Sequence, residues 1–328
     1  MAIFYFKRID NPIDNFMEYI KILIILLLFP ILIFSGCTQR ETPKKVSLNK
    51  KVSEAITKKR EAEENTLYFG FDLRLGPKED VKIYSSFLRY LEDTTGYRFR
   101  IRFSERYEDT VDNLRNGITH FAAIGPLSFI IGKESDGIKC LVSGLNEEKK
   151  SKYHAVIFTR PESDIENIRD LKGKTFAFGA RYSTQGYLIP RKMLEDAGIT
   201  LTELGYYVFA GSHSNTVRAV LNREVDAGGM QDNLARRLER EGKIRIIKIS
   251  EPFPSSLICY NTSVNSRIVE AVKSALLYFS PTGKHKDILV DWDKTEMPYG
   301  FALIDESEYE VIRVLARKYG LLSNEAQD

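Results

Sequence analysis

The stretch Gly179-Ala-Arg-Tyr-Ser-Thr-Gln-Gly-Tyr-Leu-Ile-Pro190 decides the fold, because a strand end, a hydroxyl-rich turn and a helix start follow one another in it. The segment Phe176–Gly179 is short and apolar, as in a buried strand, and Tyr187–Ala197 has the apolar spacing of an amphipathic helix. Ser183 and Thr184 lie between the two, and both are favoured N-cap residues. The pattern therefore predicts a strand, a turn and a helix whose first turn carries two hydroxyls.

This helix start is a candidate anion site. Free backbone N–H groups and the positive end of the helix dipole attract an anion, and the two hydroxyls add neutral donors without burying a cation. A tetrahedral oxyanion fits such a turn. The alternative is that Ser183 only caps its helix, and the motif alone leaves both interpretations open.

From Thr66 onward the chain alternates strand-like and helix-like segments joined by short connections. Such alternation predicts parallel βα units, and its two successive sets predict an α/β fold with two lobes. Extended segments at His154–Thr159 and Leu257–Tyr260 bracket the second set and are predicted to cross between the lobes. Final helices at Asn265–Phe279 and Glu306–Tyr319 are predicted to pack on the first lobe. The first set comprises strands at Leu67–Phe71, Arg98–Phe103 and His120–Ile124 and helices at Lys82–Asp93 and Tyr107–Asn116, and the second comprises strands at Thr175–Phe178, Tyr206–Phe209, Asp226–Met230 and Ile244–Ile249 and helices after Ser183, at Thr216–Arg223 and at Asn233–Glu241.

A second polar helix start follows Phe209, where Ser212 and His213 precede the next predicted helix. Ligands of open α/β sheets bind at the carboxyl ends of the strands, so the loops that follow the parallel strands are predicted to line one cleft. A lone histidine is often an ordinary capping or core residue. Two hydroxyl-rich helix starts in neighbouring units nevertheless favour an anion contact for His213.

The N-terminus has the pattern of an export signal. Lys7, Arg8 and Lys21 precede the apolar run Ile22–Phe34, which is short for a membrane span and suits the apolar region of a signal peptide. The small residues before Cys37 resemble a bacterial lipobox, although Phe34 stands where Leu is usual. We therefore predict a lipid on Cys37, with an uncleaved membrane anchor as the alternative. Both interpretations place the rest of the chain outside the cytoplasm.

Composition excludes several classes of protein. Residues 38–65 are rich in charge and poor in large apolar groups, so they are predicted to form a disordered polar tether. The net charge is +3, and removal of residues 1–36 leaves it unchanged, which does not suggest a nucleic-acid binder. The four histidines have no metal-ligand spacing with the cysteines, so no metal is expected. Cys140 and Cys259 lie far apart in apolar runs and are predicted to be buried and reduced, although an oxidising compartment would allow a bridge.

Several separated motifs together resemble the phosphate/phosphite/phosphonate-binding proteins of ABC importers. The likeness runs from about Leu67 to Leu321 and includes Asn116-Gly117, Ile124-Gly125-Pro126 and Asp170-Leu-Lys-Gly-Lys174. It also includes the loops at 178–190 and 209–213, Val225-Asp226-Ala227-Gly228 and Tyr299-Gly300-Phe301. The resemblance implies a two-lobe type-2 periplasmic-binding-protein fold with a central cleft, no cofactor, and capture and delivery of a ligand without chemistry on it.

The resemblance also implies a set of ligand-binding residues. The family's hydroxyl donors to the oxyanion fall on Ser183 and Thr184, with Gln185 beside them, and the imidazole falls on His213. Two tyrosines of the first lobe, Tyr107 and Tyr153, complete the set. The alternative for each of them is that it is only a packing residue.

The same resemblance bears on which ligand is bound. Family members that bind aminoalkylphosphonates hold the ammonium group with carboxylates, and one of these positions reads Phe253-Pro254-Ser255-Ser256 here, without an acid. The other falls on the segment that contains Asp232. A buried ammonium group without a paired charge is costly. We therefore favour phosphate, phosphite or a small alkylphosphonate over aminoethylphosphonate.

Taken together, the sequence predicts an extracytoplasmic solute-binding lipoprotein, monomeric and anchored to the membrane, which captures a phosphorus oxyanion for the permease of an ABC importer. One alternative is a sensor of the same fold that signals to a membrane partner. Another is an enzyme with Ser183 as nucleophile and His213 as base, but no third group orients the histidine and no metal is implied. The expected division is a signal peptide at 1–36, the tether at 37–65, lobe 1 at 66–155 with 256–328, and lobe 2 at 156–255.

Overall fold

The computed structural model describes residues 66–104, 106–107, 109–134 and 136–322. The chain divides into two compact units, Met1–Lys58 and Lys59–Asp328, and every described residue belongs to the second. The predicted signal peptide, the tether and the lipidation of Cys37 lie outside the described residues. Within the described part, no helix is both long enough and apolar enough to cross a membrane.

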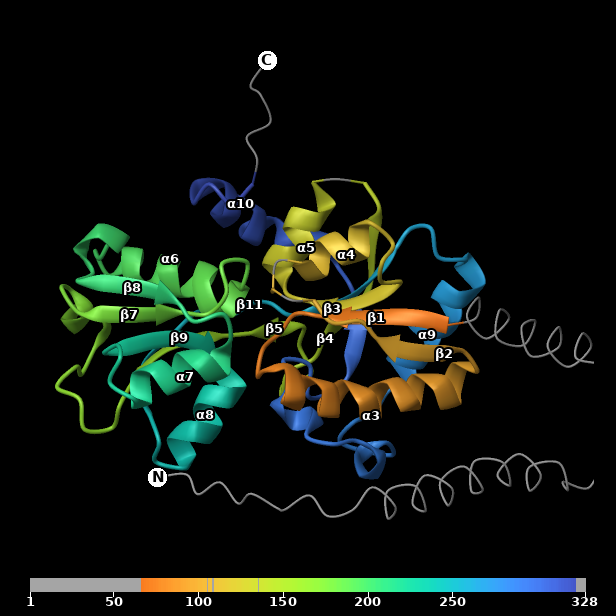
Figure 1. The fold of residues 1–328 in the computed structure, drawn as a ribbon, viewed down its shortest axis with the longest axis horizontal. Helices are drawn as coiled ribbons and strands as arrows, with labels where there is room; N and C mark the ends of the chain where they lie inside the picture. The colour runs from red at the N-terminus through yellow and green to blue at the C-terminus, as the bar shows by residue number, and fades with distance from the viewer. Residues whose placement is uncertain (1–65, 105, 108, 135, 323–328) are drawn as a thin grey trace, which may run out of the picture. The chain divides into compact units, whose positions relative to one another are not determined.

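The first lobe is built on a six-stranded mixed sheet (Figure 1). Three neighbouring strands, β2, β1 and β3, run parallel, and β12, β4 and β13 continue the sheet with antiparallel pairings. In sheet order the strands are β13 (Phe301–Leu303), β4 (Ile138–Gly144), β12 (Leu257–Asn261), β3 (Phe121–Ile124), β1 (Thr66–Phe71) and β2 (Arg98–Ile101).

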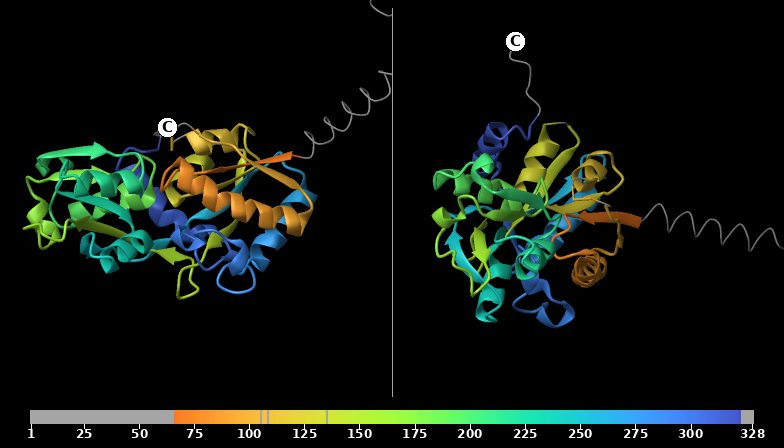
Figure 2. Two further views of the ribbon diagram at one scale, coloured as in Figure 1. Left: turned by 60° about the horizontal axis from the view of Figure 1, so that its bottom comes forward. Right: turned by 60° about the vertical axis from the view of Figure 1, so that its left-hand side comes forward.

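Helices cover both faces of this sheet (Figure 2). The apolar sides of α3 and α9 pack on one face, and those of α4, α5 and α10 pack on the other. Alternate residues of the parallel strands supply the two cores, so that Phe121 and Ala123 face α3 while Ala122 and Ile124 face α5. The helices are α3 (Pro77–Thr95), α4 (Asp109–Arg115), α5 (Pro126–Lys133), α9 (Ser266–Tyr278) and α10 (Glu310–Lys318).

The second lobe repeats this plan on a five-stranded sheet. Strands β9, β7 and β8 are parallel, whereas β6 and β10 pair antiparallel at the other edge. Helix α6 packs on one face, and α7 and α8 pack on the other (Figure 1). In sheet order the strands are β10 (Arg245–Ile249), β6 (Ala155–Thr159), β9 (Ala227–Gln231), β7 (Thr175–Phe178) and β8 (Tyr206–Phe209), and the helices are α6 (Ile189–Asp196), α7 (His213–Leu221) and α8 (Asp232–Arg240).

Two connections join the lobes, as the sequence predicts. They run side by side as a short antiparallel ribbon of β5 (Lys152–Tyr153) and β11 (Phe253–Pro254). The two segments that were predicted to cross between the lobes are β6 and β12, and each of them belongs to the sheet of a single lobe. The actual crossings lie just before them, at β5 and β11. The predicted two-lobe α/β fold is confirmed.

Two helices of the first lobe differ from the prediction. Helix α3 begins at Pro77, earlier than the expected Lys82, because proline is compatible with the first turn of a helix. Helix α5 was not expected. It is buried on nearly every side between α4 and α10, so its residues show no amphipathic period.

The prediction of reduced cysteines is wrong, because Cys140 and Cys259 form a disulfide. Strands β4 and β12 are antiparallel neighbours, and their register places the two residues opposite each other. Cys140 is also only half-buried. The two residues are 119 positions apart, and their spacing in the sequence does not reveal that their strands are adjacent.

Candidate functional site

The loop after β7 is fixed by a close contact between two glycines. The Gly179 N–H donates to the Gly186 carbonyl at 2.8 Å, and a side chain at Gly186 would lie 3.0 Å from the Gly179 Cα atom. In a regular α-helix the N–H of residue 190 would donate to the Gly186 carbonyl, but Pro190 has no N–H. The first turn, Thr184–Leu188, is accordingly π-helical, and α6 follows it at Ile189.

Ser183 caps this turn, since its Oγ accepts the Gly186 N–H at 2.9 Å. The capping role left open by the sequence is therefore present in the structure. The hydroxyl is 4% exposed and keeps its own hydrogen for another acceptor.

Thr184 reaches across to the first lobe. Its Oγ1 accepts the Leu127 N–H, in the first turn of α5, at 2.9 Å. A methyl group placed on Gly125 would lie 3.4 Å from both the Thr184 Oγ1 and the Tyr107 hydroxyl, and 3.6 Å from Oδ2 of Asp72. Three oxygen atoms from two lobes thus surround one small space.

Tyr153 and Gln185 lie on a neighbouring side of the lobe contact. The Tyr153 hydroxyl is buried without a hydrogen-bond partner among the described residues, and burial raises the pKa of this phenol. The Gln185 amide donates to the His154 carbonyl at 2.6 Å and lies 3.5 Å from the Asp232 carboxylate. Burial also raises the pKa of the half-buried Asp232. The structure therefore brings Gln185 and Asp232 together.

His213 is the first residue of α7, and its backbone N–H donates to the Arg74 carbonyl of the other lobe at 2.9 Å. Burial, with the nearby Arg74 guanidinium, lowers the pKa of the imidazole to about 3. The ring is therefore neutral at physiological pH. Its Nε2 lies 3.6 Å from Oε1 of Glu296, which is not an ion pair for a neutral ring, and its Nδ1 has no partner in the described structure.

Sequence reasoning missed three buried charged residues at this contact. Arg74, 5% exposed, forms an ion pair with Glu296, which is 4% exposed and also accepts the Ser256 hydroxyl. Nε and Nη2 of the Arg74 guanidinium have no hydrogen-bond partner in the described structure, although Nη2 lies 4.0 Å from Oδ2 of Asp72. Glu296, from a distant segment of the chain, thus places a carboxylate beside Ser256.

Asp72, at the end of β1, is fully buried. Burial raises its pKa to about 6, although the Arg74 guanidinium, the Gly125 N–H and the hydroxyls of Tyr107 and Ser128 oppose this shift. Its Oδ2 accepts the Gly125 N–H at 2.8 Å and the Ser128 hydroxyl at 3.1 Å, and the Arg74 Nη2 lies 4.0 Å away. Its Oδ1 has no partner among the described residues.

A signal for two of these residues existed in the sequence. Asp72 and Arg74 directly follow a buried strand, in a loop predicted to line the cleft. Nothing comparable marks Glu296, which lies between a short helical turn and β13.

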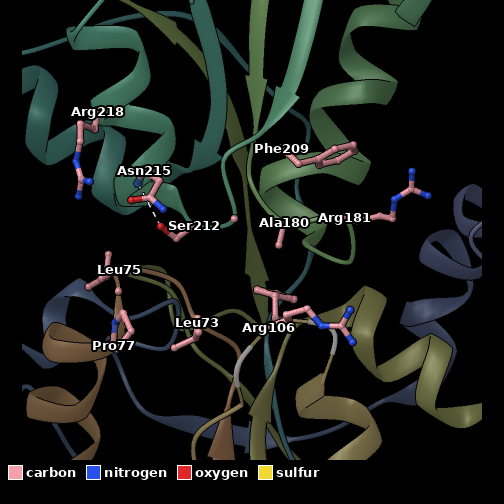
Figure 3. A pocket seen from close by; sticks show the side chains of 13 residues that line it. Leu73, Leu75, Pro77, Arg106, Ala180, Arg181, Phe209, Ser212, Asn215 and Arg218 are labelled. Carbon is pink, nitrogen blue, oxygen red and sulfur yellow. Dashed lines mark hydrogen bonds between the residues drawn. The ribbon is translucent and has the colours of Figure 1, made fainter. Parts of the chain in front are cut away.

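A cavity of about 600 Å³ opens between the lobes beside these groups (Figure 3). Leu73, Leu75 and Pro77 lie on one side of it, and Ala180 and Phe209 lie on the other. Tyr107 connects the cavity to the buried charges. The remaining lining residues are polar, positively charged or glycine: Gly76, Arg106, Arg181, Gly211, Ser212, Asn215 and Arg218.

The described residues contain no group of three or more histidines, cysteines, aspartates or glutamates placed to hold a metal ion. Hydroxyl groups from both lobes, those of Thr184 and Tyr107, approach Gly125, and hydroxyl groups can donate hydrogen bonds to an anion.

Two curated proteins of similar sequence are named as transport proteins. The phosphate-import protein PhnD of Mycolicibacterium smegmatis is 22% identical over 208 residues, which cover 58% of this chain and 64% of that protein. The probable ABC transporter phosphite-binding protein PhnD1 of Prochlorococcus marinus is 26% identical over 168 residues, which cover 48% of this chain and 55% of that protein. The matches thus span less than two thirds of either relative.

The solved structure of PhnD1 from Prochlorococcus marinus in complex with methylphosphonate has the same fold. It superposes with a TM-score of 0.69 at 19% identity, over 78% of this chain and 98% of that one. The family model described as the periplasmic phosphonate substrate-binding protein of ABC transporters matches residues 69–309, which is well over half of the chain. The resemblance seen in the sequence is confirmed: the chain belongs to the family of periplasmic substrate-binding proteins of phosphonate ABC transporters.

Proposed function

We propose that this protein captures a phosphorus oxyanion, namely phosphate, phosphite or a small phosphonate, outside the cytoplasm and delivers it to the permease of an ABC importer. The observation that carries the proposal is the meeting of buried donors from two lobes at one contact. The names of the two relatives, a phosphate-import protein and a phosphite-binding protein, support it over a signalling role. The Cys140–Cys259 disulfide is in keeping with an oxidising compartment.

We assign the ligand contacts to both lobes. Ser183, Thr184 and His213 bind the oxyanion from lobe 2, and Tyr107 and Tyr153 close over it from lobe 1. The assignment is supported by the Thr184–Leu127 hydrogen bond and by the unpartnered atoms of Tyr153 and His213. Gln185, which follows Thr184 in the chain, lies 3.5 Å from the Asp232 carboxylate, and we assign both residues to the border of the site.

Calorimetric titration of the full chain, stripped of ligand by unfolding and refolding, tests the proposal. The ligands are phosphate, phosphite, methylphosphonate, 2-aminoethylphosphonate and sulfate. At least one phosphorus oxyanion should bind, and Thr184→Ala and His213→Ala should each weaken it roughly tenfold to a hundredfold, because a hydrogen bond to a charged group contributes about 1.5–3 kcal/mol. Thr202→Ala, at an exposed threonine of the same lobe, serves as the control.

Two outcomes would overturn parts of this assignment. Unchanged affinity in Thr184→Ala and His213→Ala, with the fold intact, would place the pocket elsewhere. Phosphorus NMR should show the ligand unchanged after incubation with the protein. Steady conversion that is lost in Ser183→Ala would instead indicate an enzyme.

We further propose that Cys37 carries the lipid, that residues 38–65 form the tether, and that the lobes comprise 66–155 with 256–328 and 156–255. The pattern of Lys21, the apolar run and Gly36 before Cys37 supports the anchor. Cys37→Ala should release the chain from membranes. Membrane retention of that variant with residues 1–36 still attached would show an uncleaved anchor.

A further inference from the structure

Strand β2 is an edge of the first-lobe sheet and carries a row of arginines. It pairs with β1 alone, and the pairing continues one residue beyond the strand. Phe99 and Ile101 pack into the core under α3. Because successive side chains of a strand point to opposite faces, the alternate residues Arg98, Arg100 and Arg102 share the other face. All three arginines are exposed, so this edge presents a row of positive charge to solvent.

The neighbours of these arginines are aromatic rather than acidic. Tyr68 is the register partner of Arg100, and its ring centre lies 5.9 Å from the Arg102 guanidinium. The His120 ring stacks on Tyr68 at 5.9 Å, and its Nδ1 accepts the Tyr68 N–H. Burial lowers the pKa of His120. No carboxylate among the described residues forms an ion pair with Arg98, Arg100 or Arg102. We call these five residues the β2 patch.

The place of the β2 patch in the fold connects it to the membrane. Strand β1 begins at Thr66, which is the register partner of Arg98, so the proposed tether joins the lobe beside the first arginine of the row. A tether of residues 38–65 attached at Cys37 keeps this edge close to the bilayer. The patch also lies on the side of lobe 1 away from lobe 2 (Figure 1). Contact with a surface there leaves lobe 2 able to move.

We propose that the β2 patch docks lobe 1 on an anionic lipid surface, where the guanidinium groups of Arg98, Arg100 and Arg102 pair with the phosphates of lipid headgroups. This inference rests on the membrane attachment proposed above and goes beyond ligand capture. The guanidinium group suits this partner, because its planar fork of donors matches phosphate oxygens. One basic residue near an anionic leaflet raises the docked population about fivefold, so three raise it about a hundredfold.

Modification of arginines by phenylglyoxal, read residue by residue by mass spectrometry, tests the docking. The full chain is placed in nanodiscs of phosphatidylcholine alone or of equal parts phosphatidylcholine and phosphatidylglycerol. The three arginines of the β2 patch should react at least tenfold more slowly in the anionic discs. About 1 M salt should remove this protection, because the Debye length falls to about 3 Å. Arg236 and Arg240, exposed on α8 of lobe 2, are internal controls and should react equally in both lipids.

A single substitution tests the row itself. Arg100→Gln removes one of the three charges, so the protection of Arg98 and Arg102 in the anionic discs should fall about fivefold. Arg240→Gln is the matched control, since it makes the same change at an exposed arginine of the other lobe and should leave that protection unchanged. Circular dichroism of both variants checks that the fold is intact.

Each outcome of these measurements supports or overturns the docking. Equal reactivity of the patch in the two lipids overturns it and leaves the proposed ligand capture and anchor standing. Equal protection of the α8 arginines also overturns it, because the whole chain would then adsorb without a preferred face. Protection by dissolved glycerophosphoglycerol in neutral discs would indicate a site for a soluble phosphodiester instead. Failure of the chain to stay on either disc overturns the proposed attachment, and the docking with it.

Discussion

Replacing Asp72 by Asn should make the ligand-free protein more stable at neutral pH. The side chain is fully buried, and burial raises its pKa from the ordinary 3.8 to about 6. The folded state therefore holds this proton more tightly than the unfolded state does. The stabilising contribution is complete below pH 3.8 and is lost as the pH rises to about 6.

The pKa difference sets the size of the effect. A change from 3.8 to about 6 corresponds to about 3 kcal/mol of unfolding free energy, because each pH unit of displacement is worth about 1.36 kcal/mol. Asn avoids the cost of ionisation, but it buries an amide N–H group without a partner, which destabilises the variant by about 1 kcal/mol. A net gain of about 2 kcal/mol remains, which corresponds to a rise in Tm of about 4–8 °C for a unit of this size.

Thermal unfolding of both stripped proteins, followed by circular dichroism between pH 3.5 and 7.5, measures this difference. The groups that face Asp72 are Arg74 and three tyrosines, Tyr84, Tyr107 and Tyr153, and the arginine stays charged and the phenols stay neutral over that range. Other buried acids titrate equally in both proteins. Asp72→Asn should be about 2 kcal/mol more stable than wild type at pH 7.5 and about 1 kcal/mol less stable at pH 3.5, where only the cost of the unpaired amide remains. The quantity to compare is the unfolding free energy of the variant minus that of wild type. If this difference is lower at pH 7.5 than at pH 3.5, the ionised carboxylate stabilises the fold and the reasoning is refuted.

Three further changes have expected outcomes. Gly125→Ala places a methyl group among the three oxygens that surround it, at ordinary contact distances, so calorimetry should show at least a tenfold loss of methylphosphonate affinity with a nearly unchanged Tm. Replacing Cys140 and Cys259 by Ser opens a loop of 119 residues, which should cost about 2–4 kcal/mol in denaturant unfolding, and neither cysteine of the unreduced wild-type chain should be alkylated under denaturing conditions. Tyr319→Phe removes the 2.7 Å hydrogen bond by which the residue after α10, in lobe 1, contacts Glu195 of α6, in lobe 2. If this contact helps to hold the lobes together, solution scattering should show a larger particle than wild type without ligand and an equal particle with ligand. Equal sizes of the two ligand-free proteins would contradict this role.

The local part of the site followed from the sequence because its signals are local. The strand before Gly179, the capped turn at Ser183 and the start of α7 at His213 each depend on residues within a few positions of one another. The two places where the chain crosses were recognisable to within a few residues, although the segments predicted to cross became β6 and β12 and the crossings lie just before them. Helix α5, at Pro126–Lys133, was not, because its burial removes the period on which helix prediction depends.

The non-local part could not be predicted in this way. The Cys140–Cys259 pair depends on which strands become neighbours, and the Arg74–Glu296 pair depends on two segments more than two hundred positions apart. In neither pair does one residue predict the other, because no rule of sequence spacing links the two. The rule that loops at strand ends line the cleft identifies the loop that contains Asp72 and Arg74. It does not predict which side chains of that loop turn inward.

The buried charges also show how ligand capture can be coupled to movement of the lobes. Arg74 belongs to one lobe, yet its carbonyl accepts the His213 N–H of the other, so the contact between lobes helps to seal its guanidinium from water. Closure without a ligand buries Nε and Nη2 of Arg74 and Oδ1 of Asp72 without hydrogen-bond partners, whereas in separated lobes water can hydrogen-bond to them. A ligand that pairs with all three atoms therefore stabilises the closed form more than the open one. Because a ligand shifts an equilibrium only by its differential affinity for the two states, the cost of burying these charges makes closure depend on the ligand.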